Sequence, residues 1–263
     1  MAILDIRFNS FLLKRKITIK AILPGDPFNA YSGQAFRGEN SSLQSLYLFH
    51  GFGGDCSDWL ENTDIQRIAG KNNLAVFLVS GENSFYVDSH GDTQWETFIA
   101  QELVGYTRRL FPLSHSRQDT FVAGNSMGGF GALNIGLGHP EIFGKVVALS
   151  SALILDTIDS ISEDYVDNLA NYAYYQGIFG DLSSVAFGPL DPRYRAKKAV
   201  QAHKQPRLYL MCGTEDFLIE QNREFVRYVR DIPAEVLYEE LPGKHDWEFW
   251  SSRTHAMVQW LVS

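Results

Sequence analysis

The sequence has little that would indicate a disulfide-linked, membrane-spanning or nucleic-acid-binding protein. It holds 2 cysteines in 263 residues, which is too few for a disulfide framework, and the wide spacing of Cys56 and Cys212 matches no zinc site. Cys212 ends an apolar run and is expected to be a buried small hydrophobic residue. No apolar run approaches the ~18 residues that a membrane span needs. Lysine and arginine number 23 against 31 aspartates and glutamates, whereas nucleic-acid binding depends on clustered positive charge. These absences argue against nucleic acid, a membrane and a metal as partners.

The N-terminal segment also lacks the features of a signal peptide. Residues 1–8 alternate apolar and polar side chains and include Asp5, whereas a signal peptide needs a basic end, a longer apolar stretch and a small-residue cleavage site. Residues 3–8 and 16–23 are instead typical of two paired antiparallel strands. The basic residues 14–16 are expected to form an exposed hairpin turn between them. We therefore expect a cytoplasmic protein.

Most of the sequence predicts an α/β protein. Hydrophobic residues make up 45% and charged residues 21% of the chain, as in globular proteins, and this length suits a single α/β domain. Besides the two N-terminal strands, short and mostly apolar strands are expected at residues 46–49, 74–79, 120–123, 146–149, 208–212 and 236–241. Helices are expected at residues 95–110, 128–139 and 247–261. The alternation predicts a mostly parallel central sheet flanked by helices on both faces.

The helix expected at residues 95–110 shows the clearest periodicity. Its apolar residues recur at spacings of three and four, which places on one face Trp95, Phe98, Ile99, Leu103, Tyr106 and Leu110. Phe111-Pro112 is expected to end this helix, because proline cannot continue one.

Residues 151–200 fit the α/β alternation poorly. Among polar and acidic residues they hold the aromatic residues Tyr165, Tyr172, Tyr174, Tyr175, Phe179 and Phe187. We interpret this stretch as a cap-like insertion over one end of the sheet, within a single domain of residues 1–263. Its apolar content suits a lid, an interface between copies of a homo-oligomer, or both.

A nucleophile motif lies between an expected strand and an expected helix. Residues 124–128, Gly-Asn-Ser-Met-Gly, match G-x-S-x-G, in which small residues let the backbone close into a strained turn that exposes the serine. The alternative is a tight turn whose serine only caps the helix. Because an apolar strand precedes the motif and a helix follows it, we favour Ser126 as a nucleophile in an α/β-hydrolase fold. The Met127 N–H would then point at the oxyanion of a tetrahedral intermediate.

A second oxyanion donor is expected in the glycine-rich loop at residues 50–54, His-Gly-Phe-Gly-Gly. In α/β-hydrolases the loop after this strand donates an N–H group, and glycines allow the backbone to approach the substrate. Phe52 is our candidate through its main chain, and a glycine-rich turn without a catalytic role is the alternative. His50 precedes the serine, and we expect it to orient this loop.

The general base is selected by its place in the chain. The triad of an α/β-hydrolase follows the order serine, acid, histidine. Of the 7 histidines, His203 precedes the strand expected at residues 208–212, and His255 falls within the C-terminal helix. His245 lies in the loop between the last strand and that helix, so it is the predicted base.

The acid is expected directly after the strand at residues 208–212. A carboxylate there accepts the histidine Nδ1–H and stabilises the imidazolium. Glu215 and Asp216 compete for this role, and we favour Asp216 because the preceding turn presents it where the chain leaves the sheet. Asp246 is expected to cap the last helix.

Together these motifs resemble the esterase D-type esterases, and within them most closely the bacterial tributyrin esterases, with feruloyl esterases nearby. The resemblance rests on the residue stretches 47–54, 124–132, 213–218 and 243–247, together with Trp59. It runs from about Leu46 to the C-terminus and is weak across residues 151–200. It implies a serine carboxylesterase that hydrolyses short-chain acyl esters without a cofactor, with Ser126, Asp216 and His245 as the triad and Phe52 and Met127 as oxyanion donors.

Two other functions compete with this one. S-formylglutathione hydrolases and mycolyltransferases are relatives, so thioester hydrolysis or acyl transfer is the first alternative. The loop at residues 50–54 departs from the Ser-Gly-Leu-Thr-Cys type of the formylglutathione branch. A non-catalytic binding protein is the second alternative, although all three triad candidates are present. We expect a small apolar acyl pocket lined from the insertion, from residues 83–86 including Tyr86, and by Trp247.

Overall fold

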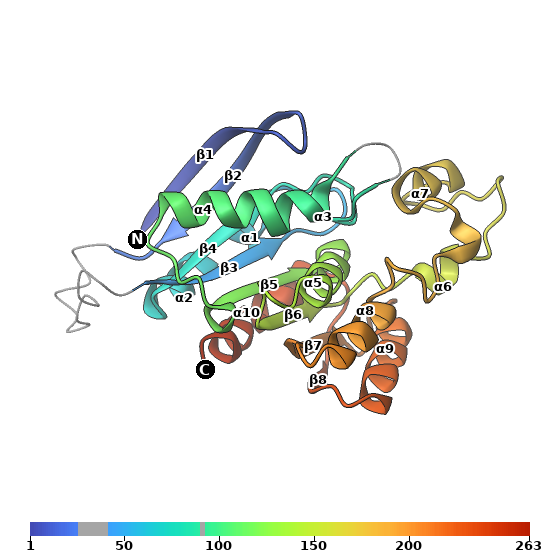
Figure 1. The fold of residues 1–263 in the computed structure, drawn as a ribbon. Helices are drawn as coiled ribbons and strands as arrows, with labels where there is room; N and C mark the ends of the chain where they lie inside the picture. Colours follow the sequence, from blue (N-terminus) through green and yellow to red (C-terminus); the bar gives the residue numbers. More distant parts are fainter. Residues whose placement is uncertain (26–41, 90–92) are drawn as a thin grey trace.

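The computed structural model describes residues 1–25, 42–89 and 93–263. In these ranges eight strands form one sheet in the order β1-β2-β4-β3-β5-β6-β7-β8 (Figure 1). The pairs β1–β2 and β2–β4 are antiparallel, and the other neighbours are parallel. The strands are β1 Ala2–Ser10, β2 Arg15–Leu23, β3 Gln44–Phe49, β4 Leu74–Val79, β5 Thr120–Asn125, β6 Lys145–Leu149, β7 Arg207–Gly213 and β8 Val236–Leu241. Every predicted strand is confirmed, as is the antiparallel N-terminal pair.

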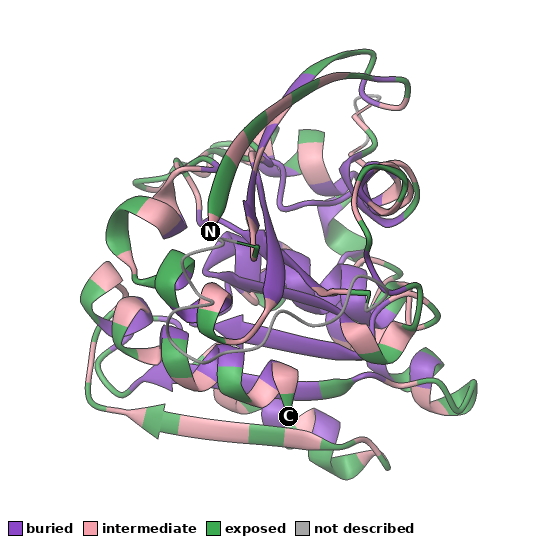
Figure 2. Ribbon diagram, turned by 90° about the vertical axis from the view of Figure 1, so that its left-hand side faces the viewer, coloured by how far each residue is buried: buried purple, intermediate pink, exposed green. Residues whose placement is uncertain are grey.

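The central strands are continuously apolar because both faces of the sheet are covered. In β3 the side chains of Tyr47 and Phe49 enter one hydrophobic cluster, and those of Leu46 and Leu48 enter the cluster on the opposite face. Figure 2 shows the central strands as buried and an edge strand with a mixed pattern. Strand β8 is that edge, and it alternates between half-buried and exposed residues.

Helices cover both faces of the sheet, as the sequence predicted. One cluster includes side chains of η2, α4, α5, α8 and α9, and the other includes side chains of α1, α2 and α10. The helices are α1 Asp58–Asn62, α2 Ile65–Lys71, α3 Trp95–Thr97, η2 Phe98–Leu103, α4 Val104–Leu110, η3 Arg117–Asp119, α5 Met127–Gly138, α6 Leu155–Ile158, α7 Tyr172–Phe179, η4 Leu182–Ser184, α8 Pro192–Gln201, α9 Ile219–Asp231 and α10 Trp247–Val262. The architecture is a three-layer α/β sandwich.

The helix predicted at residues 95–110 is present, but its buried face turns part-way along. Its middle segment, η2, is π-helical, and a π-helical turn holds more residues than an α-helical one, which shifts later residues around the axis. Val104 and Thr107 are therefore buried, whereas Leu110 is 50% exposed. The prediction that Leu110 shares one face of the helix with Trp95 and Phe98 is wrong for this reason. The helix ends at Phe111, before Pro112, as predicted.

Part of the stretch predicted as an insertion belongs to a regular layer. Helix α8 is capped by Asp191, whose side chain accepts the Arg193 N–H, and has Pro192 in its first turn. It packs against α5 and contributes Ala196 to the core. Figure 1 shows α6 and α7, by contrast, beyond the carboxyl ends of the central strands.

Both cysteines are free and buried. Burial raises the pKa of the Cys212 thiol to about 12. The prediction that Cys212 is a buried small hydrophobic residue is confirmed.

A buried ionic cluster joins three helices on one face of the sheet. The Glu96 carboxylate accepts bonds from Arg195 at 2.5 and 2.9 Å and lies 3.0 Å from His139 Nε2. Burial by itself would raise the pKa of Glu96, but the hydrogen bonds with His139 and Arg195 outweigh it and lower that pKa from its ordinary value. Glu96 therefore contributes stability while it is charged.

Replacing this carboxylate should have a pH-dependent cost. We expect Glu96→Gln to reduce the free energy of unfolding by about 3 kcal/mol at neutral pH, because it leaves the Arg195 guanidinium without its charged partner. A lowered folded pKa stabilises above the unfolded value of 4.5 and loses that stabilisation as pH falls through the folded value. The difference between wild type and variant should therefore shrink in acid. Urea titrations at several pH values measure it.

Glu141→Gln is the matched control, because Glu141 is exposed and lies 3.6 Å from the other ring nitrogen of His139. It should change stability by less than about 0.5 kcal/mol. Equal losses in both variants, or a difference that does not depend on pH, would contradict the role assigned to Glu96.

Candidate active site

Ser126 lies in a strained turn between β5 and α5. Its backbone has φ 55° and ψ −120°, a conformation that L-residues rarely adopt. Two backbone bonds hold the turn against β6, from the Ser126 N–H to the Leu149 carbonyl at 2.9 Å and from the Ala152 N–H to the Ser126 carbonyl at 3.0 Å. The sharp turn presents the serine Oγ at the carboxyl edge of the sheet.

The glycines of the motif are required by close backbone contacts. A Cβ added to Gly124 would lie 2.4 Å from the Gly128 carbonyl oxygen. One added to Gly128 would lie 2.6 Å from the carbonyl oxygens of both Phe49 and His50. The start of α5 therefore packs directly on the end of β3, and no side chain fits between them.

The structure brings the three predicted triad residues into one hydrogen-bonded chain. His245 Nε2 lies 2.9 Å from Ser126 Oγ, and His245 Nδ1 lies 3.0 Å from both carboxylate oxygens of Asp216. Ser126 follows β5, Asp216 follows β7 and His245 follows β8. The parallel strands thus place residues from distant parts of the sequence at one edge of the sheet.

Asp216 is buried, and its charge is compensated locally. Its Oδ1 accepts the Leu218 N–H at 2.8 Å. Burial by itself would raise the pKa of Asp216, but hydrogen bonds with His245, with the Ser150 side chain and with the Leu218 N–H outweigh it and lower that pKa. The carboxylate is therefore ionised at neutral pH, as a partner for the His245 Nδ1–H must be.

The structure also separates Asp216 from its competitor. The side chain of Glu215 is exposed, so Asp216 is the carboxylate that meets His245. Asp246 caps α10 by accepting the Phe249 N–H at 3.0 Å, as predicted.

The loop that carries Phe52 lies beside Ser126. A Cβ added to Gly51 would lie 3.4 Å from Ser126 Cβ and 3.2 Å from the Asn125 amide nitrogen. The Met127 N–H belongs to the first residue of α5, where helical N–H groups have no intrahelical acceptor. Neither the Phe52 nor the Met127 N–H donates to another group in the described part of the chain. Neither N–H group of the two predicted donors therefore has an acceptor among the described residues.

Comparisons with known proteins show the family to which the chain belongs. A family model described as "Putative esterase" matches residues 10–261. The chain belongs to this esterase family. It is 40% identical to an acetyl esterase of Caldicellulosiruptor saccharolyticus over 99% of this chain and 98% of that protein.

Two solved structures of serine hydrolases resemble the esterase over its whole length. A substrate-bound fluorophosphonate-binding serine hydrolase of Staphylococcus aureus has a TM-score of 0.86 and 30% identity, covering 100% of this chain and 98% of that one. An S-formylglutathione hydrolase of the same organism has a TM-score of 0.83 and 30% identity, covering 100% and 99%. The protein is a serine esterase, a carboxylic ester hydrolase, of the α/β-hydrolase fold.

The structure corrects one predicted pocket residue. The side chain of Tyr86 is 0% exposed, its ring stacks on Phe49 at 4.4 Å, and its hydroxyl donates to the His50 carbonyl at 3.1 Å. Tyr86 therefore lies in the core beneath the Phe52 loop and cannot line a substrate pocket. Burial of this kind depends on tertiary packing, which the sequence around residue 86 does not reveal.

The other predicted pocket residue, Trp247, is half-buried behind the triad. Its ring packs edge-on against Trp59 at 5.3 Å and against Trp250 at 5.1 Å. Trp250 in turn packs edge-on against His245 at 5.0 Å. A contact between Trp247 and substrate stays a prediction.

Phe217 is a site residue that the sequence analysis missed. Its ring lies 4.4 Å from the His245 ring, centroid to centroid, and its side chain is 69% exposed. It borders the histidine on the solvent side, so it could contact a bound ester. Its position directly after Asp216 was the available signal.

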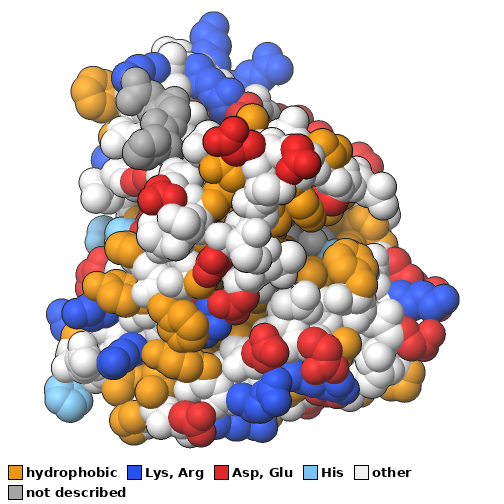
Figure 3. Space-filling model, turned by 90° about the vertical axis from the view of Figure 1, so that its right-hand side faces the viewer, with side chains coloured by type: hydrophobic (Ala, Val, Ile, Leu, Met, Phe, Trp, Pro, Cys, Tyr) orange, Lys and Arg blue, Asp and Glu red, His pale blue; other side chains and the backbone are white. Residues whose placement is uncertain are grey.

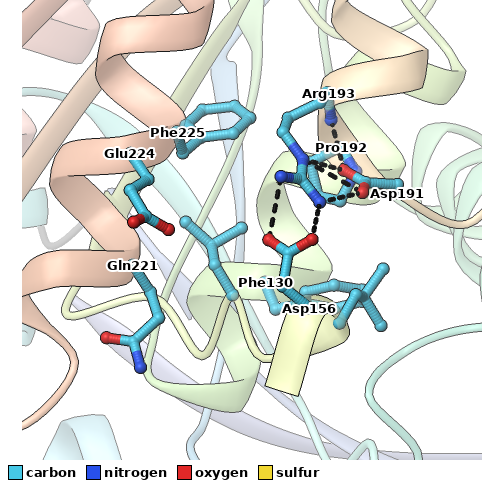
Figure 4. A pocket seen from close by; sticks show the side chains of 10 residues that line it. Phe130, Asp156, Asp191, Pro192, Arg193, Gln221, Glu224 and Phe225 are labelled. Atoms are coloured by element: carbon cyan, nitrogen blue, oxygen red, sulfur yellow. Dashed lines mark hydrogen bonds and ion pairs between the residues drawn. The ribbon is translucent and has the colours of Figure 1, made fainter. Parts of the chain in front are cut away.

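A small cavity lies apart from the triad, between α6, α8 and α9. Its wall includes Phe130, Gln221 and Arg193. The Arg193 guanidinium pairs with Asp156 at 2.8 Å and with Asp191 at 2.6 Å, so its charge is already matched (Figure 4). None of the triad residues lines this cavity.

Figure 3 shows the face that carries α6 to α9, on which hydrophobic patches lie among acidic and basic side chains. Exposed apolar residues of residues 151–200 include Val166, Leu169 and Phe187.

The described residues contain neither a metal-binding cluster nor a helix suited to a membrane. No group of three or more His, Cys, Asp or Glu side chains there could hold a metal ion. No helix of this part of the chain is long and apolar enough to cross a membrane.

The close backbone contact at the turn gives a testable prediction. We expect Gly128→Ala to lower the free energy of unfolding by about 3 kcal/mol, because the methyl group overpacks against two carbonyl oxygens. Hydrolytic activity should fall with it, since the turn that carries Ser126 must open. Urea unfolding and ester hydrolysis measure the two effects.

Gly177→Ala in α7 is the control, because its added Cβ meets nothing within 4 Å. It should leave activity unchanged and raise stability by about 0.4–1 kcal/mol. A Gly128→Ala protein as stable and active as this control would refute the packing argument.

Proposed function

We propose that the enzyme hydrolyses short-chain acyl esters, acetyl esters among them, with Ser126 as nucleophile, His245 as general base and Asp216 as the residue that orients it. The observation that carries this proposal is the continuous chain of contacts, 2.9 Å from Ser126 to His245 and 3.0 Å from His245 to Asp216. The acyl group is suggested by the relative named acetyl esterase, which the chain matches over nearly its full length.

In the first half of the proposed reaction, Ser126 Oγ attacks the ester carbonyl carbon while His245 Nε2 takes its proton. Asp216 accepts the Nδ1–H and stabilises the imidazolium that forms. His245 then protonates the leaving alcohol oxygen, and the C–O bond to that oxygen breaks to leave an acyl-enzyme. In the second half, His245 deprotonates a water molecule, which attacks the acyl carbon. The bond from that carbon to Ser126 Oγ then breaks while His245 returns the proton to Oγ, which releases the acid and regenerates free Ser126.

The negative charge on the former carbonyl oxygen is proposed to bind the N–H groups of Phe52 and Met127. Each such donor contributes about 10²–10³-fold to the rate in related chemistry. Because Met127 begins α5, the helix dipole adds positive potential at the same point. No cofactor or metal is required for any step.

Substitutions of the nucleophile Ser126 and of Asp216, which orients His245, test these roles. We expect Ser126→Ala to lower kcat on p-nitrophenyl acetate by about 10⁴-fold or more. Asp216→Asn should lower it by about 10⁴-fold, because the amide favours the wrong histidine tautomer. Ser116→Ala, an exposed serine that caps η3, is the control and should match wild type. Substantial activity in Ser126→Ala would assign the chemistry to another residue.

The substrate class is tested by kcat/KM on p-nitrophenyl acetate, butyrate and octanoate, a feruloyl ester and S-formylglutathione. We expect acetate and butyrate to be hydrolysed fastest. The thioester is included because an S-formylglutathione hydrolase is 30% identical over the whole chain. A dominant rate on it would replace the proposed substrate and keep the proposed triad.

Three broader expectations complete the proposal. Within a single domain of residues 1–263, the cap-like insertion expected at residues 151–200 is proposed for the part that precedes α8, and the position of α6 and α7 supports it (Figure 1). The exposed apolar residues of this stretch suit a lid or a homo-oligomer interface. The cytoplasmic location expected from the N-terminal sequence stays a prediction.

A further inference from the structure

His50 is a buried histidine outside the triad, at the end of β3. Its residue is 1% exposed, and both ring nitrogens have backbone partners. The Gly81 N–H donates to His50 Nε2 at 2.9 Å. Because Nε2 accepts that bond, the proton of the neutral ring is on Nδ1, which lies 2.7 Å from the Gly51 carbonyl oxygen.

The Gly51 carbonyl and the Phe52 N–H belong to the same peptide group. A peptide group is planar, with its C=O and N–H directions opposed, so a bond that holds the carbonyl also sets the direction of the N–H. His50 Nδ1 holds this carbonyl, and the Gly54 N–H donates to it as well at 3.2 Å. Bonds accepted by a carbonyl also polarise the N–H of the same group.

The surroundings keep the imidazole in place. The Tyr86 hydroxyl donates to the His50 carbonyl at 3.1 Å, and the two rings pack edge-on at 5.8 Å. A Cβ added to Gly54 would lie 3.2 Å from His50 Nδ1, so the loop closes tightly over the ring. The next peptide group along is held separately, since the Gly53 N–H donates to Asn83 Oδ1 at 2.7 Å.

We propose that His50 is a positioning residue of the oxyanion hole, which directs the Phe52 N–H at the reacting oxygen by hydrogen-bonding the Gly51 carbonyl. This inference rests on the proposed function. It explains why a histidine that cannot reach the substrate is buried between two loops. A residue that only filled space there would need neither hydrogen bond.

Two amide substitutions separate the hydrogen bonds of His50. The Asn side-chain nitrogen can take the place of Nδ1 and donate to Gly51, whereas the Gln amide reaches the position of Nε2, toward Gly81. His50→Ala removes both contacts.

Two assays report on these variants. The first measures kcat and KM on p-nitrophenyl acetate, per active site titrated with a fluorophosphonate. The second measures the inhibition constant of a short alkyl trifluoromethyl ketone, whose hemiketal oxygen occupies the oxyanion hole.

We expect His50→Ala and His50→Gln to lower kcat by about 10–100-fold with KM within about twofold, because a misdirected donor loses most of its effect on the transition state. The trifluoromethyl ketone should bind more weakly by a similar factor. His50→Asn should recover most of both losses. His139→Asn, which removes the histidine beside Glu96, is the control for lost stability and should keep wild-type kcat per titrated site.

Unchanged kcat in His50→Ala, or equal losses in the Asn and Gln variants, would overturn the inference. If His50→Ala does not fold, the difference in kcat between His50→Asn and His50→Gln tests the inference by itself. A failure of the proposed function looks different, because wild type would then lack ester hydrolysis or Ser126→Ala would retain it.

Discussion

The active site depends on one close contact, the packing of the start of α5 against the ends of β3 and β5. With only hydrogen atoms at Gly124 and Gly128, the backbone carbonyls of β3 approach the helix directly. Ser126 has its positive φ at this junction, and Gly51 lies beside it. The nucleophile, the helix N-terminus and the Phe52 loop are thereby positioned by a single rigid junction rather than by separate flexible segments.

The acid and the base are held in place by hydrogen bonds and by packing against α10. Asp216 is a buried charge, which would be costly without partners, and it receives hydrogen bonds from His245, Ser150 and the Leu218 N–H. Trp250 Nε1 donates to Ser150 Oγ at 3.0 Å, which links the acid to α10. The C-terminal helix therefore supports the triad from behind, while Phe217 covers the histidine toward solvent.

The segment between β6 and α8 is tied to the rest of the molecule at two points. Arg193 joins α8 to Asp156 of α6 through an ion pair. At the other point Tyr174 of α7 packs edge-on against Phe52 at 5.8 Å, and its hydroxyl donates to the Asn83 carbonyl. Since Phe52 is a proposed oxyanion donor, this contact joins α7 to the loop that carries that donor.

The sequence by itself determined the positions of the strands, the helices at residues 95–110, 128–139 and 247–261, and the three triad candidates. Apolar periodicity and the G-x-S-x-G motif are local patterns that reflect local physics. The sequence favoured Asp216 but kept Glu215 as an alternative acid, gave Tyr86 a place in the substrate pocket, and put Leu110 on the same apolar face as Trp95 and Phe98. Only the tertiary structure decided these, since burial and contact arise from elements far apart in the chain. The same holds for His50, whose two ring nitrogens meet backbone groups of separate loops, and for Ser150 and Phe217, which reach the triad only because parallel strands end at a common edge.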